Sequence, residues 1–276
     1  MASLSPPFLF LDTSGGRPNW NVALSTPHLA GVILKASEGT SYAPSWFAQN
    51  WQAMGVAAGT RLGSSWLRGA YHFLRFPGDG AAQADFYLTA VERAGGFVRG
   101  DIWPIVDVER GGGNASASAQ QTIDTTAAFA DRVKRRRGGK VILYGRGAMR
   151  DLGIATKMGC DYVWNPGYTA TMPMNGLSAW SPSDIVLWQY SGTDGKGNVS
   201  GSTQHGLPLT IPNFGTGVDM SVYLEGGEVG TSLAAMRRRL TGATSGWLTA
   251  LTLAAGVGAG VITARWAKRR YLHPVP

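Results

Sequence analysis

The stretch WPIVDVE, residues 103–109, decides the fold class. An apolar run with β-branched residues precedes Asp107 and Glu109, and such a run is typical of a buried strand. Residues i and i+2 of a strand point to the same face, so the two carboxylates are predicted to share one small space. Two acids at the end of a buried strand are costly unless they are paired or functional.

Runs of this kind alternate with helical stretches along the chain, which indicates a parallel sheet covered by helices. The predicted strands are residues 8–12, 31–36, 68–74, 103–109, 140–144, 161–165, 185–190 and 217–222, and the predicted helices are 44–58, 80–95 and 117–137. The later connections are rich in Gly, Pro and Ser. The sequence therefore predicts an α/β fold, a modified TIM-like barrel of eight strands with an incomplete helical ring.

Polar and aromatic residues cluster where these strands end. The carboxyl ends of barrel strands meet on one face, where active sites are built. The residues at these ends are Asp12, Lys35, Glu38, Tyr71, His72, Asp107, Glu109, Tyr144, Trp164, Trp188, Gln189 and Asp219. Rings that stack on sugars, beside carboxylates that transfer protons, predict a sugar-cleaving pocket.

Asp107 and Glu109 are the centre of this hypothesis. Two like charges in one space raise one pKa and favour a protonated acid near neutral pH. Such a pair can supply the general acid and the charge stabiliser of glycoside hydrolysis. The alternative is a structural pair that is neutralised by Arg110 or Arg75. His72 also has two interpretations, a substrate contact or a hydrogen-bonded histidine at a strand end.

Ten motifs in this order resemble glycoside hydrolase family 25, the Chalaropsis-type lysozymes of bacteria and phages, over roughly residues 8–224. The motifs are LDTSGG (11–16), KASEGTSY (35–42), FAQNWQAMGVAAG (47–59), GAYHFLR (69–75), AQADFY (82–87), PIVDVE (104–109), ILYG (142–145), WNPGY (164–168), WQYS (188–191) and GVDMSVY (217–223). The resemblance implies a modified β/α barrel. It also implies hydrolysis of the β-1,4 bond between N-acetylmuramic acid and N-acetylglucosamine in peptidoglycan.

The resemblance also implies roles for single residues. Glu109 would be the general acid, and Asp107 would stabilise positive charge at the reacting centre. Asp12 and Asp219 would hold the polar network of the pocket. The implied sugar-contacting residues are Tyr71, Tyr144, Trp164, Tyr168 and Trp188, although WNPGY departs from the usual alanine-containing motif. From their places at the strand ends, we also expect Gln189, Lys35 and Glu38 to bind substrate. A retaining path assisted by the substrate's N-acetyl group and an inverting path both stay open.

The sequence gives no indication of a metal or cofactor. A single cysteine, Cys160, excludes an internal disulfide and a thiolate zinc cluster. His28, His205 and His273 show no spacing typical of metal ligands, and a nucleotide-binding glycine motif is missing. We therefore expect no cofactor and no metal.

The positive charge is concentrated near the C-terminus. Of the 25 basic residues, seven lie in 231–276, which contains no acid, so residues 1–230 hold 18 basic residues beside all 17 acids. Basic residues that flank an apolar run point to a membrane or an anionic polymer rather than to nucleic acid. The 18 uncharged residues 247–264 predict a transmembrane or membrane-associated apolar helix, with a helix packed on the body as the alternative. Within it, Gly256 and Gly260 have a spacing that permits helix self-association.

These observations predict three parts: a lysozyme-like domain at 1–226, a basic linker at 227–245, and an apolar helix with a basic tail at 246–276. The N-terminal stretch lacks the pattern of a signal peptide, so we expect synthesis in the cytoplasm, the host's if phage-encoded, and action at the cell wall. Two functions from different classes stay open. One is a peptidoglycan hydrolase of the phage endolysin type, and the other is a non-catalytic wall-binding module on the same barrel.

Overall fold

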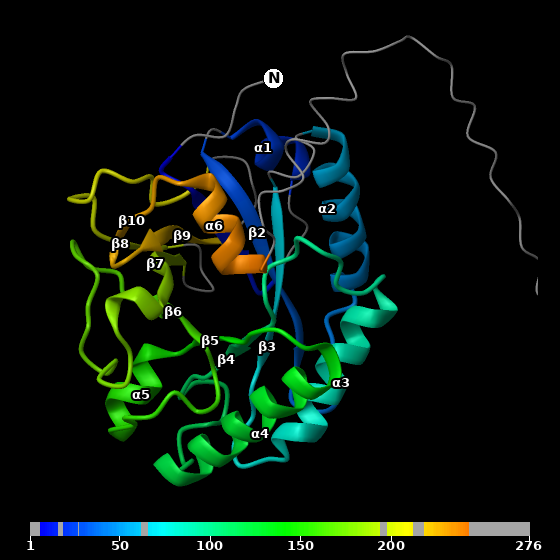
Figure 1. Cartoon of the computed structure of the whole chain (residues 1–276), viewed down its shortest axis with the longest axis vertical. Coiled ribbons are helices and arrows are strands. Elements are labelled where there is room, and N and C mark those ends of the chain that lie inside the picture. The colour runs from blue at the N-terminus through cyan, green and yellow to red at the C-terminus, as the bar shows by residue number, and fades with distance from the viewer. Residues whose placement is uncertain are drawn as a thin grey trace, which may run out of the picture. The chain divides into compact units, whose positions relative to one another are not determined.

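The computed structural model describes residues 6–15, 19–26, 28–61, 66–193, 198–211 and 218–242. Eight of its strands close into a barrel (Figure 1). They are β1 Leu9–Thr13, β2 Leu29–Glu38, β3 Leu67–Phe73, β4 Ile105–Asp107, β5 Ile142–Tyr144, β6 Tyr162–Pro166, β7 Ile185–Thr193 and β9 Val218–Glu225. Two short strands, β8 Val199–Gly201 and β10 Glu228–Val229, pair with β7 and β9. Each predicted strand overlaps one of the eight, which confirms the barrel.

The last barrel strand runs against the others. Strands β1 to β7 pair in parallel around the barrel, whereas β9 is antiparallel to both β1 and β7. The expectation of a wholly parallel barrel is therefore wrong, and the barrel is mixed. Because β9 is reversed, its amino end lies beside the carboxyl end of β1, and Asp219 is the register partner of Asp12. Asp219 thus reaches the expected face from the opposite end of its strand.

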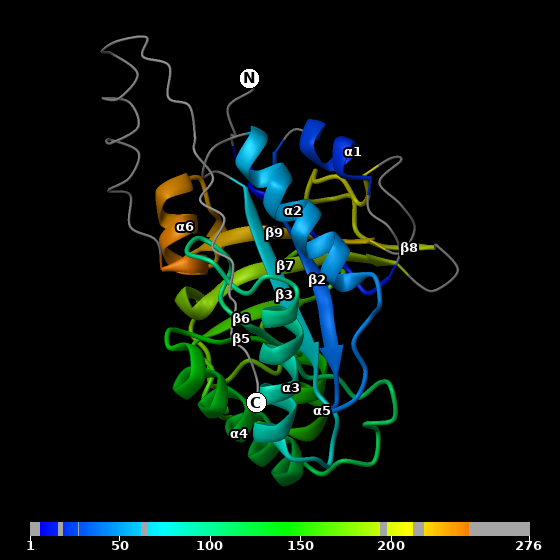
Figure 2. The same ribbon diagram turned by 90° about the vertical axis from the view of Figure 1, so that its right-hand side faces the viewer.

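Helices cover only part of the barrel. They are α1 Trp20–Ser25, α2 Phe47–Arg61, α3 Gly80–Arg93, α4 Ala119–Arg137, α5 Arg146–Leu152 and α6 Leu233–Thr241, with a 3-10 turn, η1 Pro182–Asp184. Helices α2 and α3 run along the outside of β2 and β3 (Figure 2). A single 3-10 turn stands in the connection from β6 to β7. This agrees with the predicted incomplete ring.

Strand alternation divides the core into two layers. In β4, Ile105 packs inside the barrel, and Val106 packs between the barrel and the helices. Asp107, the next inward position, then reaches the end of the strand. The inner layer contains Phe10, Ile33, Ile142 and Leu187, and the outer layer contains Trp51, Tyr87 and Phe129. The apolar floor thus ends where the carboxylates begin.

Helix α6 packs on the barrel instead of leaving it. Met236 and Leu240 are fully buried among the inner-layer residues. Trp103, which precedes β4, donates from Nε1 to the carbonyl of Arg239 at 3.1 Å and from its backbone N–H to that of Leu240 at 2.7 Å. Residues 227–245, expected to be a basic linker, therefore include β10 and α6. The sequence signal for this helix is the apolar pair Met236 and Leu240, spaced i, i+4 on one face. Three consecutive arginines stand between them, so the stretch looks like a basic linker.

The predicted apolar helix at 247–264, with Gly256 and Gly260, lies outside the described residues. Within the ranges that are described, no helix combines the length and the apolar character needed to span a bilayer.

Candidate active site

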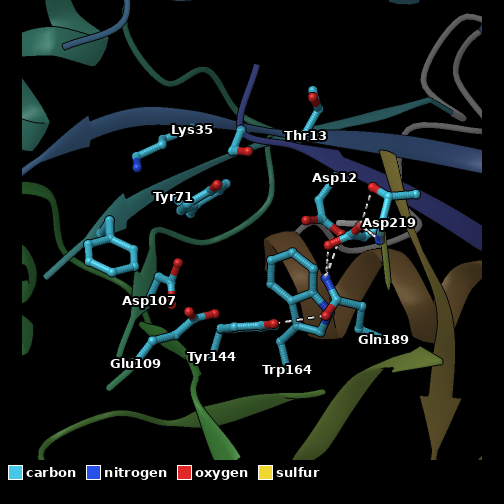
Figure 3. A pocket seen from close by; sticks show the side chains of 13 residues that line it. Asp12, Thr13, Lys35, Tyr71, Asp107, Glu109, Tyr144, Trp164, Gln189 and Asp219 are labelled. Carbon is cyan, nitrogen blue, oxygen red and sulfur yellow. Dashed lines mark hydrogen bonds between the residues drawn. The ribbon is translucent and has the colours of Figure 1, made fainter. Parts of the chain in front are cut away.

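A pocket of about 330 Å³ opens at the carboxyl ends of the parallel strands (Figure 3). Four carboxylates and one cation, Lys35, face it. Its walls are formed by Asp12, Thr13, Ser14, Lys35, Tyr71, Phe73, Asp107, Glu109, Tyr144, Trp164, Gln189, Thr193 and Asp219. The convergence predicted from the strand ends is therefore present for all four acids.

Asp107 and Glu109 enter this pocket together. Asp107 ends β4 and is 7% exposed, and its Oδ1 is buried with no hydrogen-bond partner among the described residues. Burial, and then the charge of Glu109, raise the pKa of Asp107 well above its usual value. Burial also raises the pKa of Glu109, against the opposing effect of the Tyr144 hydroxyl. The pair therefore keeps a proton to higher pH than free carboxyl groups do.

No arginine neutralises this pair in the described part of the chain. Arg75 forms its ion pair with Glu38, and Arg110 donates to two main-chain carbonyls. The alternative of a structural pair held by either arginine is therefore wrong.

Gln189 joins the acids of two strands to two tyrosines. Its Nε2 donates to Asp12 Oδ1 at 2.9 Å and, at 3.4 Å, to Asp219 Oδ2. Its Oε1 accepts from the hydroxyl groups of Tyr144 at 2.8 Å and Tyr168 at 2.9 Å. These four bonds use both ends of the amide. Gln189 therefore fixes the outline of this side of the pocket.

Asp12 and Asp219 also hold protons more tightly than free carboxyl groups. Burial, and then the charge of Asp219, raise the pKa of Asp12 well above its usual value. Burial also raises the pKa of Asp219. Thr193 opposes that rise, because its backbone N–H and its hydroxyl donate to Asp219 Oδ1 at 2.6 and 3.0 Å.

Lys35 and Glu38 form an ion pair at the rim of the pocket, but only one of them lines it. Lys35 lines the pocket, and its Nζ lies 4.8 Å from the centre of the Phe73 ring. Glu38 accepts from Lys35 Nζ at 2.5 Å and pairs with Arg75, but it is not part of the wall. Of the two, only Lys35 is brought to the predicted site, with Glu38 as its anchor.

The predicted aromatic residues divide in the same way. Tyr71, Tyr144 and Trp164 line the pocket, while Tyr168 lies beside it and is 40% exposed. Trp188 is buried in the outer core, where its Nε1 donates to the carbonyl of Gly167 at 2.7 Å. Neighbouring strand residues point to opposite faces, so Trp188 cannot face the pocket beside Gln189. The structure does not support a sugar contact for Trp188.

His72 belongs to the core. It is fully buried, its ring lies within hydrogen-bond distance of Ser37 Oγ at 2.8 Å and Gln83 Oε1 at 3.2 Å, and it stacks on Phe129. Burial lowers its pKa to about 3, so the ring is neutral in the folded protein. The structural interpretation of His72 is correct.

Four wall residues were missed by the sequence analysis: Thr13, Ser14, Phe73 and Thr193. Phe73 follows Tyr71 by two residues on β3, so strand alternation could have found it. Thr193 lies beyond residue 190, where the predicted strand stopped, because β7 continues into Gly- and Thr-containing sequence.

Carboxyl groups with raised pKa values beside aromatic walls, at the carboxyl end of a β/α barrel, form a site suited to glycoside hydrolysis. A sequence profile of glycosyl hydrolases family 25 matches residues 15–201. The chain therefore belongs to this family, and its enzyme class is glycosidase. Asp107 and Glu109 lie within the matched range, whereas Asp12 and Asp219 lie outside it.

Individual relatives agree with the family. The chain is 35% identical over 144 residues to an N,O-diacetylmuramidase of Chalaropsis sp., an alignment that covers 48% of this chain and 63% of the relative. The chain spans between 54% and 63% of the length of the curated relatives that it matches.

Solved structures share the fold. A bacterial lysozyme from Streptomyces coelicolor superposes with a TM-score of 0.61 at 22% identity, covering 85% of this chain and 97% of that one. The catalytic domain of an endolysin from bacteriophage P40 of Listeria monocytogenes gives 0.57 at 19% identity, covering 88% and 100%.

Proposed function

We propose that this chain is an N-acetylmuramidase that hydrolyses the β-1,4 bond between N-acetylmuramic acid and N-acetylglucosamine in peptidoglycan. One observation carries the proposal: Asp107 and Glu109, both with raised pKa, share a pocket with aromatic walls. Family membership and the similarity to a muramidase support the substrate class.

Glu109 acts as the general acid in this proposal. Its raised pKa favours the protonated form, and the proton is given to the glycosidic oxygen as the bond to the anomeric carbon breaks. The sugar that keeps the anomeric carbon gains positive charge at that moment. The other carboxylates of the pocket stabilise that charge.

Asp107 orients the substrate's own acetamido group. Its buried Oδ1 has no donor among the described residues and can accept a hydrogen bond from the acetamido N–H. The acetamido oxygen then forms a bond to the anomeric carbon as the leaving oxygen takes the proton of Glu109. A water later attacks that carbon, the bond to the acetamido oxygen breaks so that the acetamido group is restored, and the proton of the water goes to Glu109, which gives retention. Proton NMR should show the β anomer first, and an initial α anomer would instead support direct attack by water.

The test is the loss of turbidity of purified cell walls. The unmodified chain should clear them, and Glu109→Gln should clear them about a hundredfold more slowly, because the amide cannot donate the acid's proton. Glu92→Gln is the matched control, since Glu92 lies on α3, is exposed and pairs with Arg136. The control should retain the full rate.

Two results would contradict the proposal. Equal clearing by Glu109→Gln and the control would remove Glu109 from its role. Walls that bind the unmodified chain without being cleared would favour the non-catalytic wall-binding module. Product analysis after digestion separates a muramidase from a glycosidase that acts on chitin-like chains.

The cellular role is a separate proposal, supported by sequence. We propose a lytic enzyme of the endolysin type, synthesised in the cytoplasm and acting on the wall, with residues 247–264 and their basic neighbours binding a membrane. The uncharged run and the tail's excess of basic residues support the membrane part.

A further inference from the structure

A second hollow of about 280 Å³ adjoins the acid pocket. Glu109 and Tyr144 line both spaces, so Glu109 stands between them. The second space is bounded by the segment after β4, the start of α5 and the segment after β6. A glycan cleaved at Glu109 passes along this residue, so the second hollow is in reach of substituents carried by the sugars that flank the cleaved bond.

The two spaces carry opposite charge. The pocket has four carboxylates and one lysine. The hollow has three arginines, Arg110, Arg146 and Arg150, with Asp151 and the shared Glu109 as its acids. An anionic group is therefore repelled by the first space and attracted by the second.

Two of these arginines, Arg146 and Arg110, are held in place by hydrogen bonds to uncharged groups. Arg146 donates from Nε to the carbonyl of Pro166 at 2.8 Å and from Nη1 to Oδ1 of Asn175 at 2.8 Å. Arg110 is held by main-chain carbonyls. In the described part of the chain, neither has a carboxylate within ion-pair distance, whereas Arg150 pairs with Asp151 at 2.7 Å. Fixed positive charge therefore remains available to a ligand.

We propose that this hollow binds a carboxylate carried by the glycan beside the cleaved bond, with Arg146 as its principal contact. A guanidinium matches the two oxygens of a carboxylate better than it matches a neutral hydroxyl or amide. This inference rests on the proposed function, since it concerns the same substrate. It adds an orientation: the ring of the reacting N-acetylmuramic acid lies on the acid side of Glu109, and its lactyl carboxylate, or the peptide that extends it, lies on the arginine side.

In peptidoglycan such a carboxylate has two sources. N-acetylmuramic acid carries a lactyl carboxyl group, which is either free or extended by a peptide with carboxylates of its own. Three tetrasaccharides of alternating N-acetylglucosamine and N-acetylmuramic acid distinguish them: one with free lactyl acids, one with their methyl esters, and one extended by alanyl-glutamate.

The experiment measures binding by titration calorimetry in the Glu109→Gln background, which prevents turnover. The ligand that carries the recognised carboxylate, either the free acid or the peptide form, should bind about tenfold tighter than the ester. This ratio is what the loss of one charge-assisted hydrogen bond predicts. Adding Arg146→Gln should abolish this difference, and Arg146→Lys should keep part of it. Arg135→Gln, an exposed arginine of α4 paired with Asp131, is the matched control and should keep all of it.

Equal affinity for acid, peptide form and ester in the parent, no binding of any of them, or a preference that survives Arg146→Gln would overturn the inference. Retention of partial preference in Arg146→Lys guards against a folding defect. The wall-clearing assay judges the proposed function separately. If the chain preferred the carboxylate but did not clear walls, the carboxylate site would be supported and the proposed muramidase activity would be wrong.

Discussion

At the scale of single residues, Gln189 shows how one neutral amide organises four ionisable neighbours. Asp12 and Asp219 accept from one end of the amide, and the hydroxyls of Tyr144 and Tyr168 donate to the other. Gln189 thus acts as a positioning residue for side chains that line the pocket on both sides of its amide.

Gln189→Met should therefore lower both stability and activity. It leaves Asp12, a buried acceptor, without the donor that the amide supplies, which costs about 1–3 kcal/mol of the free energy of unfolding. Urea denaturation measures this cost. The control is Gln120→Met, an exposed residue of α4, which should change stability by less than about 0.5 kcal/mol. Equal stability of the two variants would show that the network contributes nothing to folding.

Asp107 should make the protein less stable as pH rises. Its folded pKa is raised, so its protonated form is favoured in the folded state, and stability is lost as pH increases from the unfolded pKa through the folded one. Asp107→Asn should therefore be more stable than the parent at pH 8 but not at pH 4. Each tenfold change in proton affinity corresponds to about 1.4 kcal/mol.

Urea unfolding at both pH values tests this for Asp107→Asn, for the parent and for Asp131→Asn, an exposed control on α4. The same stability difference between Asp107→Asn and the parent at both pH values would contradict the raised pKa.

At the scale of elements, apolar runs and strand ends were enough to predict the barrel and its four acids. The sequence pattern carries no strand direction, so the reversal of β9 was missed, although Asp219 reaches the correct face. Trp188 and Gln189 are neighbours on β7, so strand alternation alone predicts that only one of them faces the pocket. The pairing of Glu38 with Arg75 depends on the fold and has no local signal.

Whether helix α6 is part of the folded domain can be tested, because the sequence analysis predicts a linker there. Met236 is fully buried against the barrel interior, so Met236→Ala should cost about 2–5 kcal/mol in unfolding free energy. Arg238→Ala, an exposed residue on the same helix, should cost less than about 0.5 kcal/mol. Thermal and urea unfolding measure both. If neither variant changed the unfolding free energy, residues 233–241 would behave as a linker and not as part of the domain.

At the scale of the whole molecule, acidic and basic residues are concentrated in different places. The formal net charge is +8, although residues 1–230 are nearly balanced. Inside that balanced part, the active-site pocket collects four acids and the adjoining hollow collects three arginines. The fold thus separates an acidic space, where positive charge develops during hydrolysis, from a basic space, where we propose that a substrate carboxylate binds. The remaining excess of basic residues lies near the C-terminus.

A chain that ends at Gly242 should separate wall hydrolysis from membrane binding. It keeps α6 and every residue that lines either space, so it should clear isolated walls at the rate of the full chain. It loses the uncharged run 247–264 and four of the seven basic residues in 231–276, each of which contributes about 1 kcal/mol near an anionic surface. Sedimentation with phosphatidylglycerol vesicles should therefore pellet the full chain and leave the shortened one in solution. Neutral phosphatidylcholine vesicles isolate the electrostatic part, and equal pelleting of both chains would place membrane binding in the barrel.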